Sequence, residues 1–225
     1  MADDETNENE NIRFEDWISV IQYKTYPRFD GTELPWIAPT SEIDQFALER
    51  QSRREPSNAR LDAYVLSGIL RFSAGRQREG EEARCYPSAG ARYPLELYLL
   101  VYDVEGMEDG AYHYSVLDHQ LTRLWNPPTR ENLQAAWDAE EPDLRSARVV
   151  FFFSSLEERT TMKYGELGSH FPLIECGYLG FLILQQAHRH GLHYCPMGAQ
   201  WNEEQFRAFF DLDEDERILH AIVIQ

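Results

Sequence analysis

The sequence predicts an α+β fold in a single domain. Three observations support this prediction. The chain has 225 residues, of which 43% are hydrophobic, enough for one sizeable core. Helical and strand patterns follow one another without internal repeats, and no Pro/Ser-rich linker divides the chain. Residues 1–12 are acidic and rich in asparagine, so we expect a disordered tail, with residues 13–225 forming the domain.

The first half of the chain predicts an extended arm followed by two helices. Residues 13–40 mix aromatic residues with Pro and Gly and are expected to run over the surface as the arm. A short helix should follow Ser41, because Glu42 and Asp44 would suit its first turn. A second helix over 61–74 is expected to end at Gly75. Its apolar positions are Leu61, Val65, Ile69 and Phe72.

The rest of the chain predicts strands interspersed with three helices. Leu95 to Val104 is apolar on both faces, which is typical of a central strand. The other expected strands are the hairpin GAYHYSV and HQLTRLW, the buried segment ARVVFFFSS, the short segment HYCPMGA, and ILHAIVI. The expected helices begin at Thr129, span 170–190 up to Gly191, and follow Asn202.

Charge and cysteine content restrict the partners and the compartment. A net charge of −18 opposes nucleic-acid binding, because phosphates would be repelled. The N-terminus has no apolar core of a signal sequence, and Glu175 interrupts the longest apolar stretch, so no membrane span is predicted. The cysteines, Cys85, Cys176 and Cys195, are odd in number and lack paired metal spacing, which favours a reducing cytoplasm.

Three stretches are candidates for a site. In YPSAGARYP, the small residues Ser88, Ala89 and Gly90 would let a flat ligand approach the backbone, although they also suit an ordinary turn. Pro87 and Pro94 would stiffen the two ends of this loop, and Arg92 adds a fixed charge. In ERQSRREPS, a phosphate would fit the alternating residues Arg50, Ser52 and Arg54, although a solvated basic patch is the alternative.

The third stretch contains one of only two lysines. Lys24 and Lys163 are the lysines, so 19 of the 21 basic residues are arginine. Lysine can lose its proton near neutral pH when desolvated, and a neighbouring ammonium favours ionised tyrosine. Lys163 and Tyr164 are therefore candidates for a general base, unless Lys163 is merely an exposed residue and Tyr164 a core aromatic.

The histidines near the end of the long helix are not assigned to a metal. These residues are His188, His190 and His193, with Cys195 nearby. His188 and His190 fall on different sides of a helix, and Gly191 then breaks it. Glu96 and Glu175 interrupt apolar runs and are interpreted as buried carboxylates with satisfied hydrogen bonds.

Taken together, these stretches resemble the SagB/ThcOx-type dehydrogenases, the azoline oxidases of the FMN-dependent nitroreductase superfamily. The resemblance covers most of the chain from about Tyr23 onward. It is carried by RQSRR, YPSAGARYPLELYLLV, GAYHYSVLDHQLTRL, KYGELG and CPMGA, in family order. It implies a nitroreductase-like fold, in which helices flank a central mixed or antiparallel sheet, and a homodimer with FMN at the subunit interface.

The resemblance also implies roles for individual residues. Arg50, Ser52 and Arg54 would hold the phosphate and ribityl chain of FMN. Pro87, Ser88, Ala89 and Gly90 would run against its ring, with Arg92, Met197 and Gly198 also in the cofactor set. Lys163 and Tyr164 would match the family's catalytic Lys-Tyr pair. The family's Gly-His and Gln-Asn pairs are replaced by Gly177-Tyr178 and Phe181-Leu182, and its C-terminal basic residues are missing or replaced by Arg217.

The implied reaction is the oxidation of a thiazoline or oxazoline ring to thiazole or oxazole in a modified peptide. A base removes the Cα proton, a hydride leaves Cβ for the flavin, and oxygen reoxidises the flavin. A cyclodehydratase complex is the implied partner. Two alternatives remain open: an NAD(P)H-dependent oxidoreductase acting on another small molecule, and a flavin-poor scaffold of a biosynthetic complex.

Overall fold

The computed structural model describes residues 24–137, 143–198 and 201–225. The chain divides into two compact units, Met1–Pro39 and Thr40–Gln225. The predicted boundary between residues 12 and 13 lies outside the described residues. The expected tail over residues 1–12 lies outside the described residues, as do residues 13–23 of the expected arm. In the first unit, residues 24–39 contain a turn in which the backbone N–H of Phe29 donates to the carbonyl of Tyr26 at 3.0 Å.

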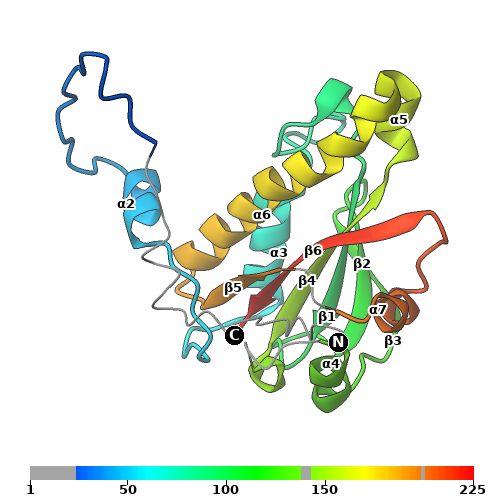
Figure 1. The fold of residues 1–225 in the computed structure, drawn as a ribbon. Helices are drawn as coiled ribbons and strands as arrows, with labels where there is room; N and C mark the ends of the chain where they lie inside the picture. Colours follow the sequence, from blue (N-terminus) through cyan, green and yellow to red (C-terminus); the bar gives the residue numbers. More distant parts are fainter. Residues whose placement is uncertain (1–23, 138–142, 199–200) are drawn as a thin grey trace, which may run out of the picture. The chain divides into compact units, whose positions relative to one another are not determined.

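The second unit is built on a six-stranded sheet, which confirms the α+β prediction (Figure 1). Its strand order is β3-β2-β1-β4-β6-β5, and every neighbouring pair is antiparallel. The strands are β1 (Leu95–Val101), β2 (Gly110–Ser115), β3 (Gln120–Trp125), β4 (Val149–Leu156), β5 (Tyr194–Met197) and β6 (Glu216–Ile224).

Six α-helices surround or adjoin this sheet in the described residues. They are α2 (Glu42–Glu49), α3 (Ala63–Ser73), α4 (Arg130–Ala136), α5 (Glu158–Tyr164), α6 (Phe171–Arg189) and α7 (Glu203–Phe210). The expected helix starts are confirmed at Ser41, Thr129 and Asn202, whose side chains accept backbone N–H bonds of the first turn. Short 3-10 turns cover Ala89–Ala91, Leu144–Ser146 and Gly165–His170.

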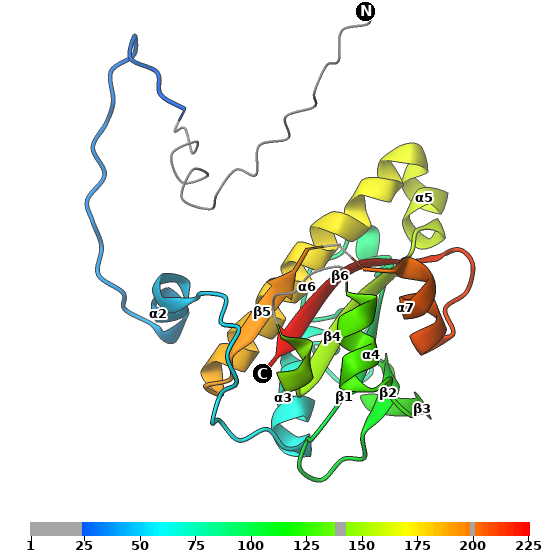
Figure 2. The ribbon, with the colours of Figure 1, turned by 60° about the horizontal axis from the view of Figure 1, so that its bottom comes forward.

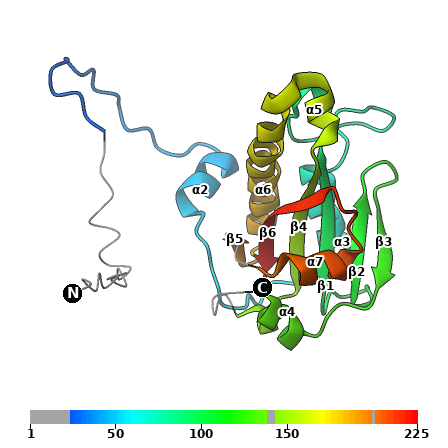
Figure 3. The ribbon, with the colours of Figure 1, turned by 45° about the vertical axis from the view of Figure 1, so that its right-hand side comes forward.

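The helices form one layer on each face of the sheet (Figures 2 and 3). Helices α3 and α6 pack on one face, where Ile69 and Ile183 meet Leu99 and Phe151 in one apolar cluster. Helices α4 and α7 pack on the other face in a second cluster. Because both faces are covered, the central strands β1 and β4 are mostly apolar, with Glu96 in β1 and Ser154 and Ser155 in β4 as the polar residues.

Three local features differ from the sequence prediction. Helix α5 was not expected, because ERTTMKY is short and has no apolar periodicity. Phe72, expected on the buried face of the second helix, is 53% exposed, and Leu66 and Leu70 are buried instead. By length and composition the helical stretch Glu158–Arg189 could cross a membrane, but α6 packs one face on the sheet, like the core helix of a globular domain.

Candidate functional site

The loop between α3 and β1 has an unusual backbone. Gly90, Ala91 and Tyr93 have φ angles of 60°, 54° and 45°, a region that only glycine adopts readily. The hydroxyl of Ser88 stabilises this shape because it accepts the backbone N–H of Tyr93 at 2.8 Å. Backbone strain of this kind persists only where surrounding contacts enforce it, and it is concentrated at functional sites.

The loop approaches the two candidate general bases, Lys163 and Tyr164, at Gly90. A Cβ on Gly90 would lie 2.5 Å from the Tyr164 hydroxyl and would also collide with Lys163 Nζ. A side chain at residue 90 would therefore push these two side-chain ends away, and it would also strain a backbone whose φ is 60°. The structure thus brings together the loop and the Lys-Tyr pair, although about 70 residues of chain separate them in sequence.

The two candidate bases are held differently. The ring of Tyr164 packs edge-to-face on Phe171, with ring centroids 5.0 Å apart, and its side chain is half-buried. Lys163 lies in the last turn of α5, is exposed, and places Nζ 5.3 Å from the centre of the Tyr164 ring. The single chain therefore does not itself supply the burial that was expected to desolvate Lys163.

Arg92 belongs to a polar network that anchors the loop to the sheet. Its Nε donates to the carbonyl of Arg159 at 2.7 Å, and Arg159 in turn donates to the carbonyl of Tyr93 and pairs with Glu96 at 2.6 Å. Burial alone would raise the pKa of Glu96, but the bonds from His113 and Arg159 outweigh it and lower that pKa. No sequence pattern indicated this network, because its members are distant along the chain.

Glu175 holds the other side of the loop. Its Oε1 accepts the Ser88 hydroxyl at 2.9 Å and the Ala89 backbone N–H at 3.1 Å. Among the described residues, Oε2 is buried and has no hydrogen-bond partner. The sequence interpretation of Glu175 as a fully satisfied carboxylate is therefore wrong for one of its two oxygens.

The phosphate candidates lie after α2. The side chains of Arg50, Ser52 and Arg54 are exposed and make no hydrogen bond or ion pair with the described residues. Their neighbour Arg53 is engaged, since its backbone N–H donates to Tyr194 and its guanidinium lies 3.1 Å from His193 Nε2. The alternating residues are thus free to bind an anion.

The loop and the arginines lie at different ends of α6. Ser88 bonds Glu175 in the second turn of α6, whereas the Phe46 ring of α2 packs on His188 near its C-terminus, with ring centroids 5.2 Å apart. His188 follows Glu175 by thirteen positions, which corresponds to about 20 Å of helix. Figure 1 shows the same separation, with α5 and α2 at opposite ends of α6.

The last two cofactor candidates lie at the end of β5. The side chain of Met197 is buried in the apolar cluster that faces α4 and α7. Gly198 is exposed, and a Cβ placed on it would meet no atom within 4 Å among the described residues. Any contact of Met197 with a cofactor would therefore use its backbone.

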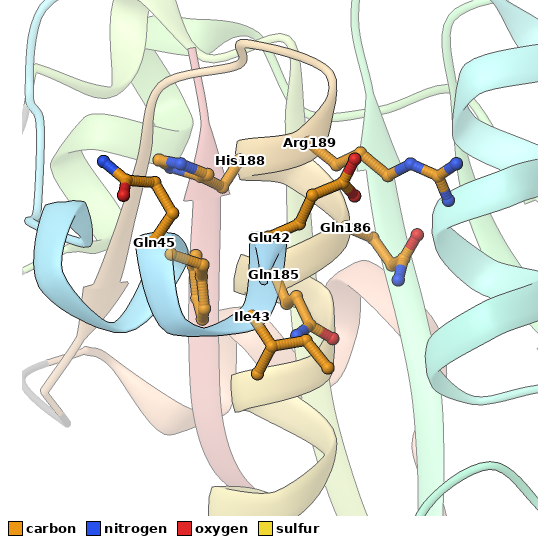
Figure 4. Close-up of a pocket in the computed structure, with 8 residues that line it drawn as sticks. Glu42, Ile43, Gln45, Gln185, Gln186, His188 and Arg189 are labelled. Carbon is orange, nitrogen blue, oxygen red and sulfur yellow. The ribbon is translucent and has the colours of Figure 1, made fainter. Parts of the chain in front are cut away.

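A hollow of about 440 Å³ lies between α2 and the C-terminal half of α6 (Figure 4). Its lining comes from Glu42 to Phe46 and from Gln185 to Arg189. None of the predicted site residues lines it, so the candidate site rests on the contacts of Gly90 and not on this hollow.

One face of α6 is apolar and exposed. Tyr178 and Phe181, which replace polar residues of the family pattern, are 48% and 47% exposed. Leu173 and Ile174 are also exposed, and Gly177 adds no side chain to the same region. A contiguous apolar surface of this kind is typical of an interaction site.

Two of the histidines near Gly191, His188 and His193, have side-chain partners other than a metal. His188 lies 3.3 Å from the Tyr194 hydroxyl and 3.6 Å from a Glu49 oxygen, and His193 Nδ1 lies 2.8 Å from the Glu55 carbonyl. In the part of the chain that the structure describes, no group of three or more His, Cys, Asp or Glu residues is arranged to hold a metal.

The described residues fit the chemistry of FMN. Pro87 and Gly90 are exposed, and the loop between them carries only small side chains, so its backbone is open to a flat ring. The unpaired guanidiniums of Arg50 and Arg54 and the Ser52 hydroxyl suit a phosphate. FMN binding would require both the loop and the arginine cluster, and within one chain these lie near opposite ends of α6.

Comparisons with known proteins identify the family of the chain. A sequence profile of the nitroreductase family matches residues 47–224. A protein of Methanocaldococcus jannaschii described as a nitroreductase is 31% identical over 162 residues, 72% of this chain and 81% of that protein. The trifolitoxin-processing protein TfxB of Rhizobium leguminosarum bv. trifolii is 29% identical over 161 residues, 64% of this chain and 41% of TfxB.

Solved structures share the fold. The Escherichia coli microcin synthetase McbBCD complex with bound truncated pro-MccB17 gives a TM-score of 0.70 at 20% identity, over 94% of this chain and 80% of that chain. A Desulfovibrio desulfuricans structure described as a nitroreductase in complex with FMN gives 0.55 at 16% identity, over 83% and 86%. The profile match and the archaeal relative show that the chain belongs to the nitroreductase family of FMN-dependent oxidoreductases.

Proposed function

We propose that this protein is an FMN-dependent oxidase that converts thiazoline or oxazoline rings of a modified peptide into thiazole or oxazole. The observation that carries the proposal is the contact of Gly90 with Lys163 and Tyr164. It places two candidate bases beside the loop that would carry the flavin. The similarity to TfxB, a toxin-processing protein, supports a peptide substrate.

The chain's own residues would bind the cofactor from two sides. Arg50, Ser52 and Arg54 would hold the phosphate and ribityl chain, because their donors are exposed and unpaired within the described chain. The backbone of Pro87 to Gly90 would lie against the ring, with Arg92, Met197 and Gly198 at its edges. Arg92 would act mainly by fixing the loop, since its Nε already binds the Arg159 carbonyl.

A homodimer would bring these two sets together. The loop and the arginine cluster of one chain lie at opposite ends of α6, so a two-fold pair can place the loop of one copy beside the arginines of the other. The exposed apolar face around Tyr178 and Phe181 offers a surface for such a pair. Formation of the pair would also cover Lys163 and reduce its contact with water.

The proposed reaction transfers one proton and one hydride from the azoline ring to separate acceptors. Oxidation of the ring removes a proton from Cα and a hydride from Cβ, and the electrons of the Cα–H bond form the new double bond. FMN, when bound, supplies the hydride acceptor, and dioxygen is the final oxidant. Lys163 or Tyr164, in its deprotonated form, would take the Cα proton, and the ends of both side chains lie beside Gly90 of the loop.

The proposed setting is a cytoplasmic complex with a cyclodehydratase that makes the azoline ring. Cys85 and Cys176 are free thiols, which suits a reducing compartment. The structural similarity to a chain of the microcin synthetase complex supports assembly with such a partner. The strongly acidic chain opposes nucleic-acid binding on electrostatic grounds.

The shared site can be tested by complementation. Arg50→Ala should disable the arginine cluster that would bind the phosphate, and Gly90→Val should disable the loop that would bind the ring. Neither homodimeric variant should therefore retain FMN. A purified heterodimer of the two variants contains one site in which both sides are intact. It should therefore bind one FMN. Loss of all binding in a correctly folded heterodimer would show that the loop and the arginines of the same chain act together.

The reaction can be tested with purified protein and a thiazoline-containing peptide under air. Loss of two hydrogen atoms by mass spectrometry, without added nicotinamide, is the expected result. The alternative, favoured by the relationship to the archaeal protein, is NAD(P)H-dependent reduction of nitroaromatics or quinones. A protein that catalyses only this reduction, or that binds no flavin at all, would contradict the proposed reaction.

A further inference from the structure

Glu175 lies beneath the candidate flavin loop as a buried carboxylate. It is the fifth residue of α6, is 2% exposed, and belongs to the face of the helix that packs inward. A carboxylate in such a place normally has donors for both oxygens, because an unsatisfied buried oxygen destabilises the fold. Here only Oε1 has partners among the described residues.

The two bonds to Oε1 organise the strained part of the loop. The Ser88 hydroxyl donates to Oε1 at 2.9 Å while accepting the Tyr93 N–H at 2.8 Å, so a continuous chain of bonds joins Glu175 to the far end of the loop. The Ala89 N–H donates to the same oxygen at 3.1 Å. Between these anchor points lie Gly90 and Ala91, both with positive φ.

We propose that Glu175 is a positioning residue that holds the loop Pro87–Gly90 in the shape needed to bind FMN and to contact Lys163 and Tyr164. This role rests on the proposed function, since it assigns FMN binding to the loop. Glu175 is not itself a catalytic residue, because its only described bonds run to the loop.

Burial makes a carboxylate unfavourable at this position unless its bonds to the loop are needed. Burial raises the pKa of Glu175, and the bonds from Ser88 and Ala89 offset this only in part. Arg84 is the nearby cation that favours the ionised form, while Tyr86 and Cys176 face the same region. A leucine would fill this position without an orphan oxygen, so the carboxylate serves the loop and not the core.

The test compares Glu175→Ala, Glu175→Gln and Ser88→Ala with an exposed control, Glu166→Gln. FMN affinity is measured by quenching of flavin fluorescence. Loss of the acceptor in Glu175→Ala should raise the FMN Kd about 10-fold or more, whereas Glu175→Gln keeps a carbonyl acceptor and should rescue most of the affinity. Ser88→Ala should weaken binding in the same direction, and Glu166→Gln should not change it.

A second readout does not depend on FMN. Hydrogen exchange of the Ala89 and Tyr93 amides in the flavin-free protein should accelerate in Glu175→Ala and remain close to wild type in Glu175→Gln. If the wild-type protein binds no FMN while exchange changes as described, the proposed function fails but the anchoring of the loop stands. The proposal would be overturned if folded Glu175→Ala bound FMN as tightly as wild type and showed unchanged hydrogen exchange of the loop amides. If Glu175→Ala does not fold, the same two measurements on Ser88→Ala decide the question.

Discussion

The hydroxyl of Tyr164 lies 2.5 Å from the position that a Cβ on Gly90 would occupy. The absence of a side chain at residue 90 therefore leaves room for the ends of Lys163 and Tyr164 beside the loop. The contact joins two segments that no local sequence pattern would place together, and it is the geometric basis of the proposed site.

Gly90→Ala should displace Lys163 and Tyr164 and strain a backbone whose φ is 60°. We expect a loss of about 1–2 kcal/mol in the free energy of unfolding from the left-handed conformation alone, together with weaker FMN binding. Gly68→Ala is the matched control, because a Cβ there meets nothing within 4 Å and the residue lies inside α3. It should stabilise the protein by about 0.5–1 kcal/mol in urea denaturation. Equal FMN affinity in Gly90→Ala and wild type would contradict the proposed contact.

Lys163→Met and Tyr164→Phe should separate binding from chemistry. Neither residue is assigned to hold FMN, so both variants should retain the flavin absorption of the wild type. Removal of the residue that acts as general base should reduce turnover by about 10²–10⁴-fold. Single-turnover reduction of the bound flavin by a thiazoline peptide measures this directly. Normal rates in both variants would place the base elsewhere.

The raised pKa of Glu175 predicts how stability depends on pH. Because the folded-state pKa lies above its ordinary value of 4.5, the folded state binds more protons than the unfolded state between the two values. The contribution of Glu175 to stability therefore falls as pH rises from 4.5 through the folded-state pKa. Glu175→Gln does not titrate, so its stability relative to wild type should increase with pH over this range. Urea denaturation of both proteins at several pH values checks the slope. If the free energy of unfolding of Glu175→Gln minus that of wild type falls as pH rises, the assignment is contradicted.

The three cysteines should differ in reactivity. Burial raises the pKa of the Cys176 thiol to about 12, and Cys176 and Cys195 are both buried, whereas Cys85 is half-buried. Since the thiolate is the nucleophile, iodoacetamide should modify Cys85 first in the native protein. Peptide mapping by mass spectrometry should show the other two labelled only after unfolding. Rapid native labelling of Cys176 would indicate that the start of α6 opens readily.

Sequence patterns predicted the sheet better than the short helices. The short, β-branched and aromatic run VVFFF indicated a fully buried strand, and residues such as Thr129 and Asn202 marked helix starts through their capping side chains. The sequence did not predict helix α5, because its seven residues have no apolar face and its position depends on packing with the turn that follows. Phe72 was misassigned because periodicity does not determine which side of a helix meets the sheet.

The candidate site was predicted only in part. The small residues of the loop and the free arginines carry local signals that the sequence displays, but their roles came from the family resemblance. The anchors Glu175 and Arg159 could not be recognised, because each acts on a loop about 65 to 90 residues away. Long-range hydrogen bonds of this kind leave no spacing pattern in a single sequence.

The central claim is that the loop around Gly90 and the arginines after α2 form an FMN site between two copies of the chain. Its most direct test is a titration of the purified chain with FMN. The complex is then analysed by sedimentation velocity, with detection of the flavin absorbance at about 450 nm. We predict that the absorbance saturates at one FMN per chain and sediments with a dimer. Flavin that remains unbound, or that sediments with a monomer, would contradict the account.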